Sequence, residues 1–347
     1  MMKLQKRFQD EWPRLSAFKT LTNSIEKIGG VNLLPVAISL VALALINPST
    51  WVTLTVAGLA MGMMIFLMAS GLSLIFGLMD VLNFSHSAFV SFGAFIAASV
   101  LARMAGWNES ESVILNLMAL FSAIGVATIF GMLVGFLFEK IIIKPVYGDH
   151  LRQILITVGA LIVSEQLILA LWGGAPISVL RPNFLRSSII IGDISIEIYR
   201  LFAVVLGLVV FVALQLILNR TRIGLLVRAG VENREMVEAL GFKVERLFIG
   251  VFVVGSGLAA MGGAMWAGYE TLITPALGAN MLITVFIVVI IGGLGSVQGS
   301  LLGALIVGLS GNYMAFLFPK MALATNMIVM LIILMWRPYG LRPAVKL

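Results

Sequence analysis

The sequence predicts an all-α protein, a polytopic bundle of helices that spans a membrane. Hydrophobic residues make up 60% of its 347 residues and charged residues only 11%, and the mean hydropathy is +1.08. A soluble domain carries about 25% charged residues. This chain has too few polar side chains to cover a surface that faces water, so lipid must be part of its solvent.

Apolar runs of spanning length give the number of helices. A span needs about 20 apolar residues, with roughly 17 to 25 tolerated. The runs lie at 31–47, 52–76, 85–105, 113–138, 153–172, 199–218, 247–268, 281–294, 297–318 and 321–337. The first and last are short, and the eighth and ninth share a glycine-rich junction. Ten spans is the working count, and eight or nine spans with a re-entrant segment is the alternative.

The distribution of basic residues predicts the orientation, because cytoplasmic loops are enriched in Lys and Arg. Of the 23 basic residues, 18 fall in the segments 1–30, 139–152, 219–246 and 337–347. The other five are Arg103, Arg181, Arg186, Arg200 and Lys320. Both termini are therefore expected in the cytoplasm. The same rule explains the net charge of +7, so no nucleic-acid partner is expected.

The chain divides into a basic segment 1–30, a transmembrane domain 31–337 and a tail 338–347. In the first segment, apolar residues from Leu4 to Ile28 recur about every 3.4 positions among cations, which favours an amphipathic helix on the membrane surface. No GxxxxGK[ST] loop and no cysteine occur, and two histidines alone cannot build a metal site. No cofactor or metal is expected in this chain.

The cytoplasmic loop 219–246 contains a candidate docking helix over Val231–Leu240, followed by Gly241 as its C-terminal cap. Met236, Val237 and Leu240 are expected on one face. So short an apolar face cannot stand alone in water, which favours docking into a groove of another protein. An ordinary solvated loop is the alternative.

Two polar or glycine-rich segments interrupt the apolar runs, and both are candidates for a substrate path. Backbone freed from a helix persists in a membrane only where protein or a wet cavity satisfies it. The candidate residues are Asn83, Ser85, His86 and Ser87 in the first segment, and Gly292, Gly293, Gly295 and Ser296 in the second. We expect the two segments to face each other. A capped cytoplasmic turn and simple close packing of glycines are the respective alternatives.

Glu165 is a single carboxylate deep in the run 153–172. Such a charge costs about 2.5–3.5 kcal/mol or more at the bilayer centre, so it should face the bundle interior. We expect a hydrogen bond to another helix in preference to a role in transport.

Three motifs together resemble the branched-chain amino acid ABC transporter permease family. They are GLSLIFGLMDVLNFSHSAFVSFGAF (71–95), VRAGVENREMVEALGFKVERLFIGVFVVGSGLAAMGGAMWAG (227–268) and IGGLGSVQGSLLGALIVG (291–308). The second contains Glu238-Ala239-Leu240-Gly241, which looks like the EAA-type coupling loop of bacterial importers. The resemblance covers about residues 52–337 and is strongest to the smaller of the two permease subunits. The first 50 residues depart from it.

The resemblance implies an ABC importer permease fold in a bacterial inner membrane. Expected partners are a second homologous permease, two ATP-binding subunits that hold ATP and Mg²⁺, a periplasmic or tethered solute-binding protein, and membrane lipid. Coupling to the ATPase is implied for Glu235, Met236, Glu238, Ala239, Leu240 and Gly241. The chain itself is not expected to be an enzyme.

The expected solutes are branched-chain or related small amino acids, moved by alternating access. Urea, short amides or other small carboxylates are the alternative within the family. A self-sufficient secondary transporter is the competing class, favoured by the two interrupted segments and Glu165 but lacking a cluster of ion-coupling residues. A membrane enzyme has no HExxH or GxSxG motif to support it.

Overall fold

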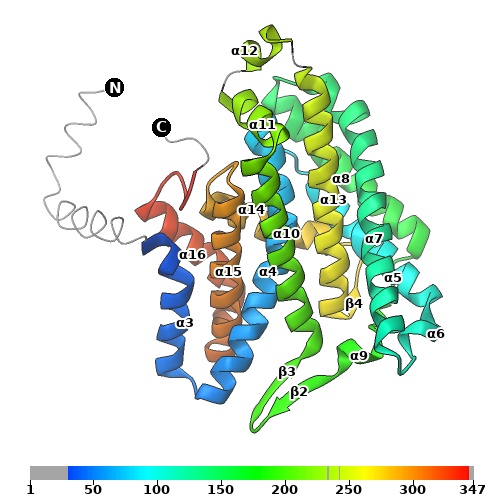
Figure 1. Ribbon diagram of the computed structural model, residues 1–347, viewed down its shortest axis with the longest axis vertical. Helices are drawn as coiled ribbons and strands as arrows, with labels where there is room; N and C mark the ends of the chain where they lie inside the picture. The colour runs from blue at the N-terminus through cyan, green and yellow to red at the C-terminus, as the bar shows by residue number, and fades with distance from the viewer. Residues whose placement is uncertain (1–29, 233, 242, 344–347) are drawn as a thin grey trace, which may run out of the picture.

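The computed structural model describes residues 30–343 apart from 233 and 242, so the predicted amphipathic segment lies outside the described residues. All ten apolar runs form helices (Figure 1). They are α3 (Leu34–Leu45), α4 (Pro48–Met79), α5 (His86–Arg103), α7 (Val113–Phe138), α8 (His150–Trp172), α10 (Ile198–Arg220), α13 (Val244–Glu270), α14 (Leu277–Gly292), α15 (Val297–Leu317) and α16 (Ala322–Trp336). Among the described residues, seven helices are long and apolar enough to cross a membrane, and three apolar helices are shorter. The predicted all-α membrane bundle is confirmed.

Short elements connect these helices at the two ends of the bundle. One end carries the helices α11 (Arg222–Glu232) and α12 (Arg234–Ala239), and we call it the α12 end. The opposite end carries α6 (Ala105–Asn108), α9 (Asn183–Arg186) and the hairpin of β2 (Ser188–Ile191) and β3 (Ile194–Glu197), and we call it the hairpin end. Strands β1 (Ile177–Ser178) and β4 (Leu272–Ile273) pair there too. The remaining turns are η1 (Gly30–Leu33), η2 (Glu139–Ile143), η3 (Lys144–Val146) and η4 (Pro319–Met321).

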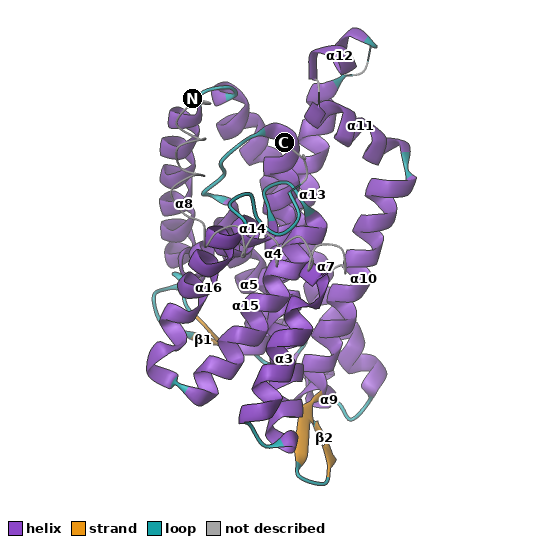
Figure 2. Ribbon diagram, turned by 90° about the vertical axis from the view of Figure 1, so that its left-hand side faces the viewer, coloured by secondary structure: helices purple, strands orange, loops and turns teal. Residues whose placement is uncertain are grey.

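Helices α4 and α13 form the centre of the bundle. Helix α4 packs against α15, α13, α10 and α14, and α13 packs against α7 and α5. Small residues allow these backbones to approach closely, since a Cβ built at Gly71 would lie 2.2 Å from the carbonyl oxygen of Gly255. This is the way membrane helices gain contact when lipid offers no hydrophobic driving force. Helices α8 and α10 lie at the margin, and Figure 2 shows α10 diverging from α13 toward the α12 end.

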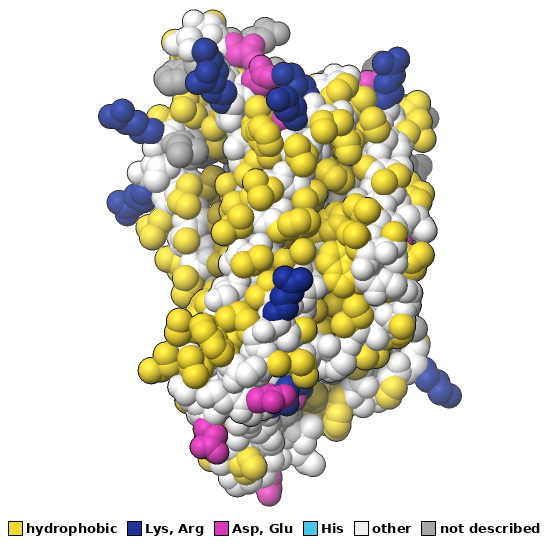
Figure 3. Space-filling model, turned by 90° about the vertical axis from the view of Figure 1, so that its right-hand side faces the viewer, with side chains coloured by type: hydrophobic (Ala, Val, Ile, Leu, Met, Phe, Trp, Pro, Cys, Tyr) yellow, Lys and Arg dark blue, Asp and Glu magenta, His cyan; other side chains and the backbone are white. Residues whose placement is uncertain are grey.

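The surface has the distribution expected for a membrane protein. In Figure 3 hydrophobic side chains cover the middle of the molecule, and charged side chains gather mainly at its two ends. The described basic residues that were predicted from the sequence to be cytoplasmic lie in the segments at the α12 end. Arg181, Arg186 and Arg200 lie in or beside the elements of the hairpin end. The two groups of cations are therefore separated by the apolar band.

Candidate functional site

Two of the central helices end in the same unusual way. Asp80 follows α4 with φ of 50°, and Thr271 follows α13 with φ of 62°, the two positive-φ residues other than glycine in the described part of the chain. A side chain in this conformation costs about 1–2 kcal/mol, so the surrounding structure must hold both turns in place. Each turn leads through a short non-helical segment into a new helix, α5 at His86 and α14 at Leu277.

The beginnings of α5 and α14 meet inside the bundle. The Gly278 N–H donates to the Ser91 hydroxyl at 2.8 Å, and the ring of Phe84 stacks on that of Phe286 with 5.0 Å between centroids. A Cβ at Gly278 would lie 2.3 Å from the Ser87 carbonyl oxygen, so only glycine permits this approach. The positive ends of two helix dipoles are thereby directed into one region.

The polar side chains at the start of α5 are buried. None of Asn83, Ser85, His86 and Ser87 is more than 2% exposed. His86 Nε2 lies 2.9 Å from the Met68 carbonyl oxygen, and the Ser85 hydroxyl donates to Asn83 Oδ1 at 2.6 Å. Ser85 makes no capping bond with its side chain, so the alternative of a capped cytoplasmic turn does not describe this segment.

Two atoms of this cluster have no hydrogen-bond partner among the described residues, Asn83 Nδ2 and His86 Nδ1. The amide nitrogen is a donor, and Nδ1 is an acceptor when Nε2 donates to the Met68 carbonyl. Buried polar atoms are nearly always satisfied in proteins. The start of α5 therefore holds unused hydrogen-bonding capacity at the place where a path through the bundle would run.

The glycine segment lies elsewhere. Gly293–Ser296 is a tight turn between α14 and α15 at the α12 end, with φ of +99° at Gly293 and +78° at Gly295. A Cβ at Gly292 would lie 2.4 Å from the Gly299 carbonyl carbon, and one at Gly77 would lie 2.6 Å from Gly295 Cα. The Ser296 hydroxyl accepts from the Gly299 N–H at 3.0 Å and caps α15. Close packing, the alternative left open by the sequence, therefore accounts for Gly292 and Gly295.

The contacts between the interrupted segments differ from the expected ones. Residues 83–87 contact Gly278 and Phe286 of α14, whereas the glycine turn contacts the end of α4 and the segment 340–343. The sequence reasoning missed the segment 271–276 as the counterpart of 80–85. Pro275 and Gly278, which interrupt the apolar stretch there, are the signal that would have found it.

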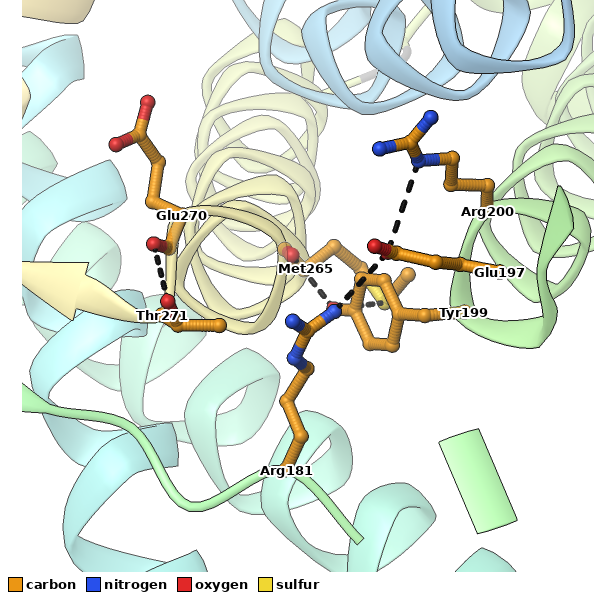
Figure 4. A network of polar contacts seen from close by, with 7 residues as sticks. All are labelled: Arg181, Glu197, Tyr199, Arg200, Met265, Glu270 and Thr271. Atoms are coloured by element: carbon orange, nitrogen blue, oxygen red, sulfur yellow. Dashed lines mark hydrogen bonds and ion pairs between the residues drawn. The ribbon is translucent and has the colours of Figure 1, made fainter. Parts of the chain in front are cut away.

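A polar cluster ties three elements together at the hairpin end (Figure 4). Glu197 forms ion pairs with Arg181 at 3.4 Å and with Arg200 at 3.6 Å. The Arg181 guanidinium also lies 5.6 Å from the Tyr199 ring centroid, and the Tyr199 hydroxyl donates to the Met265 carbonyl at 2.6 Å. This cluster holds the loop before α9 and the start of α10 against the end of α13.

The candidate docking loop differs from its prediction in two respects. Residues 231 and 232 end α11, and α12 is a separate helix, so Val231–Leu240 is not a single element. Met236 and Leu240 are 60% and 70% exposed, but Val237 is buried because it faces α13 and not solvent. Gly241 has φ of +86°, as expected of a cap.

The remaining residues of the predicted coupling set lie in or beside α12. Glu235 belongs to α12, though its side chain is outside the described residues, and Glu238 and Ala239 are exposed. Two adjoining apolar side chains are therefore presented at the α12 end, beside exposed polar positions. That surface is suited to a protein partner.

Glu165 does not form the predicted bond between helices. Its side chain is partly exposed on α8, at the margin of the bundle, and no hydrogen bond or ion pair joins it to the described residues. The expectation fails because Ser164, one position earlier, faces the core in its place.

Taken together, the bundle of apolar helices, the two interrupted helices at its centre and the exposed short helix α12 have the architecture of a membrane permease. Residues 54–336 match the family described as branched-chain amino acid transport system / permease component, and the chain belongs to that family. The predicted family is confirmed.

The curated relatives carry names of the same kind. The chain is 27% identical over 305 residues to the high-affinity branched-chain amino acid transport system permease protein BraD of Pseudomonas aeruginosa, covering 84% of this chain and 96% of that one. It is 24% identical to the LivH permease protein of Salmonella typhimurium, covering 83% and 95%. The probable LivH permease protein of Methanocaldococcus jannaschii is 26% identical, covering 80% and 88%. No solved structure matches the chain at a comparable level.

Proposed function

We propose that this chain is the transmembrane permease subunit of an ATP-binding-cassette importer for branched-chain or related small amino acids. The observation that carries the proposal is the family match over residues 54–336. The chain also aligns with nearly the whole length of relatives that are named as branched-chain amino acid permeases. The chain forms the path and is not itself an enzyme. ATP and Mg²⁺ belong to partner subunits, and the chain holds no cofactor of its own.

The family of the chain supports the proposed partners, and each is assigned to one part of the molecule. Two ATP-binding subunits serve the transporter, one of which contacts Met236, Leu240 and their neighbours at the α12 end. A periplasmic or tethered solute-binding protein contacts the hairpin end. A second homologous permease completes the path. The α12 end faces the cytoplasm of a bacterial cell, and the membrane is the inner membrane. The excess of Lys and Arg in the segments of that end supports this orientation.

The junction of α5 and α14 is the proposed gate of the path. Asn83, Ser85, His86 and Ser87 are its polar residues, and their burial is consistent with a closed state. Separation of α5 from α14 would break the bond between Gly278 and Ser91 and expose the unused Asn83 amide and His86 nitrogen to a solute. Gly292, Gly293, Gly295 and Ser296 form the turn about which α14 moves relative to α15.

Co-purification and reconstituted uptake test the proposal. The tagged full-length chain should bring down an ATP-binding subunit. Vesicles holding the complex and its binding protein should take up leucine, isoleucine or valine only with ATP inside the compartment facing the α12 end. A preference for urea or a short amide would show that the chain belongs to a permease for those solutes and not for branched-chain amino acids. Uptake driven by an ion gradient, without any ATPase, would make the chain a secondary transporter.

A further inference from the structure

An apolar pocket of about 540 Å³ separates α10 from α13 near the α12 end. Leu214 and Ile217 of α10 face Val251 and Val254 of α13 across it. Val227 of α11 and Val237 of α12 close it on the side of the loop. Binding sites for small ligands occupy roughly 300–1,000 Å³, so this pocket has room for a flexible apolar chain.

The mouth of the pocket carries two cations. All described residues that line the pocket are aliphatic or glycine, except Lys243 and Arg246. Both of these side chains are exposed. Neither forms an ion pair with a described residue, whereas Glu245 between them pairs with Lys144. Since no described acidic side chain pairs with Lys243 or Arg246, the positive charge at the mouth fits an anionic group.

The position of the pocket relative to α11 indicates that the pocket faces lipid. Helix α11 begins where the span α10 ends, with the Thr221 hydroxyl accepting from the Gly224 N–H at 3.2 Å. Its Val227 and Gly230 face the bundle, while Arg222 is exposed. Such an amphipathic helix lies at the boundary of head groups and acyl chains. From this position of α11, the pocket beneath it is expected at the depth of the acyl chains of one leaflet.

We propose that this pocket binds an anionic phospholipid, with an acyl chain between α10 and α13 and the phosphate at Lys243 and Arg246. Basic pockets between membrane helices bind acidic head groups for the same electrostatic reason. The bound chain supports α11 and α12 from below, so it holds the proposed coupling surface in place. The lipid site is independent of which solute the permease carries.

A transported amino acid fits the pocket less well. Its ammonium group needs an acceptor, and no acidic or hydroxyl side chain is among the described residues that line the pocket. Burial of an ammonium without such a partner is strongly unfavourable. An anionic phospholipid presents its phosphate to the two cations and an acyl chain to the aliphatic walls, so both its charge and its apolar part meet a complementary surface.

Native mass spectrometry of the full-length chain, purified with the subunits that accompany it, tests the site. The titrants are phosphatidylglycerol and phosphatidylcholine with identical acyl chains. One phosphatidylglycerol should be retained about 25-fold more tightly than phosphatidylcholine, since each cation contributes about fivefold. The double variant Lys243→Gln/Arg246→Gln should remove this preference. Both side chains are exposed, so folding is preserved.

A second variant fills the pocket. A Cβ at Gly250 meets no atom within 4 Å, so Gly250→Phe places its ring in the pocket and should weaken binding of both lipids more than tenfold. The matched control is Gly159→Phe on α8, where a Cβ also meets no atom within 4 Å and which does not line this pocket. It should bind both lipids as the wild type does.

Four results would overturn the proposal. Equal retention of the two lipids by the wild type would show that there is no site selective for anionic lipid. Unchanged lipid binding by Gly250→Phe would show that the lipid does not bind in this pocket. Retention of leucine that Gly250→Phe abolishes would assign the pocket to the transport path. A cross-link from a cysteine at Leu214 to another polypeptide would show that a protein helix fills it. The parent chain has no cysteine, so this label would be unique within it.

Discussion

Removal of the two exposed apolar side chains of the coupling loop should detach the ATPase. The double variant Met236→Ser/Leu240→Ser changes residues that are 60% and 70% exposed and leaves the buried Val237 intact. Full burial of such a side chain contributes about 1.5–3 kcal/mol, and about two thirds of each remains to be buried by a partner. The loss is therefore about 1–2 kcal/mol per residue.

The two losses together correspond to a binding constant weaker by about 30-fold to several hundred-fold. The measurement is the affinity of the purified ATP-binding subunit for the permease in nanodiscs, with ATP-driven uptake as a second readout. The matched control is Tyr339→Ser, because Tyr339 is 67% exposed near the same end but lies outside the loop. Wild-type affinity in the double variant, or an equal loss with Tyr339→Ser, would refute the coupling assignment.

Three further predictions follow from single positions. Gly241→Val should reduce uptake by straining the cap by about 1–2 kcal/mol, while Gly241→Asn, which tolerates φ of +86°, should retain it; equal uptake by both would contradict a role of the cap. Ser87→Trp should block uptake in transport assays without preventing co-purification of the complex, and normal transport would remove Ser87 from the path. Reporter fusions at residue 347 and at Asp193 in the hairpin should report the cytoplasm and the periplasm respectively, and the reverse result would invert the orientation.

The helices of the chain were determined by the sequence alone, which also predicts the sidedness of the chain. Length and hydropathy located all ten helices, because a backbone in lipid must satisfy its hydrogen bonds within each segment. The distribution of basic residues predicted which loops lie together at each end of the bundle, because the enrichment of Lys and Arg in cytoplasmic loops is also a property of local sequence. The motifs around Asn83 and Glu238 were enough to predict the family that the comparison then showed.

Contacts between distant residues were decided only by the tertiary structure. The bond from Gly278 to Ser91 joins residues 187 positions apart, and no local pattern indicates which of two glycine-bearing segments meets the start of α5. Helical periodicity placed Val237 beside Met236 and Leu240, but the proximity of α13 decided that Val237 is buried. The pocket between α10 and α13 exists for the same reason, since it depends on how far two helices diverge and not on the composition of either.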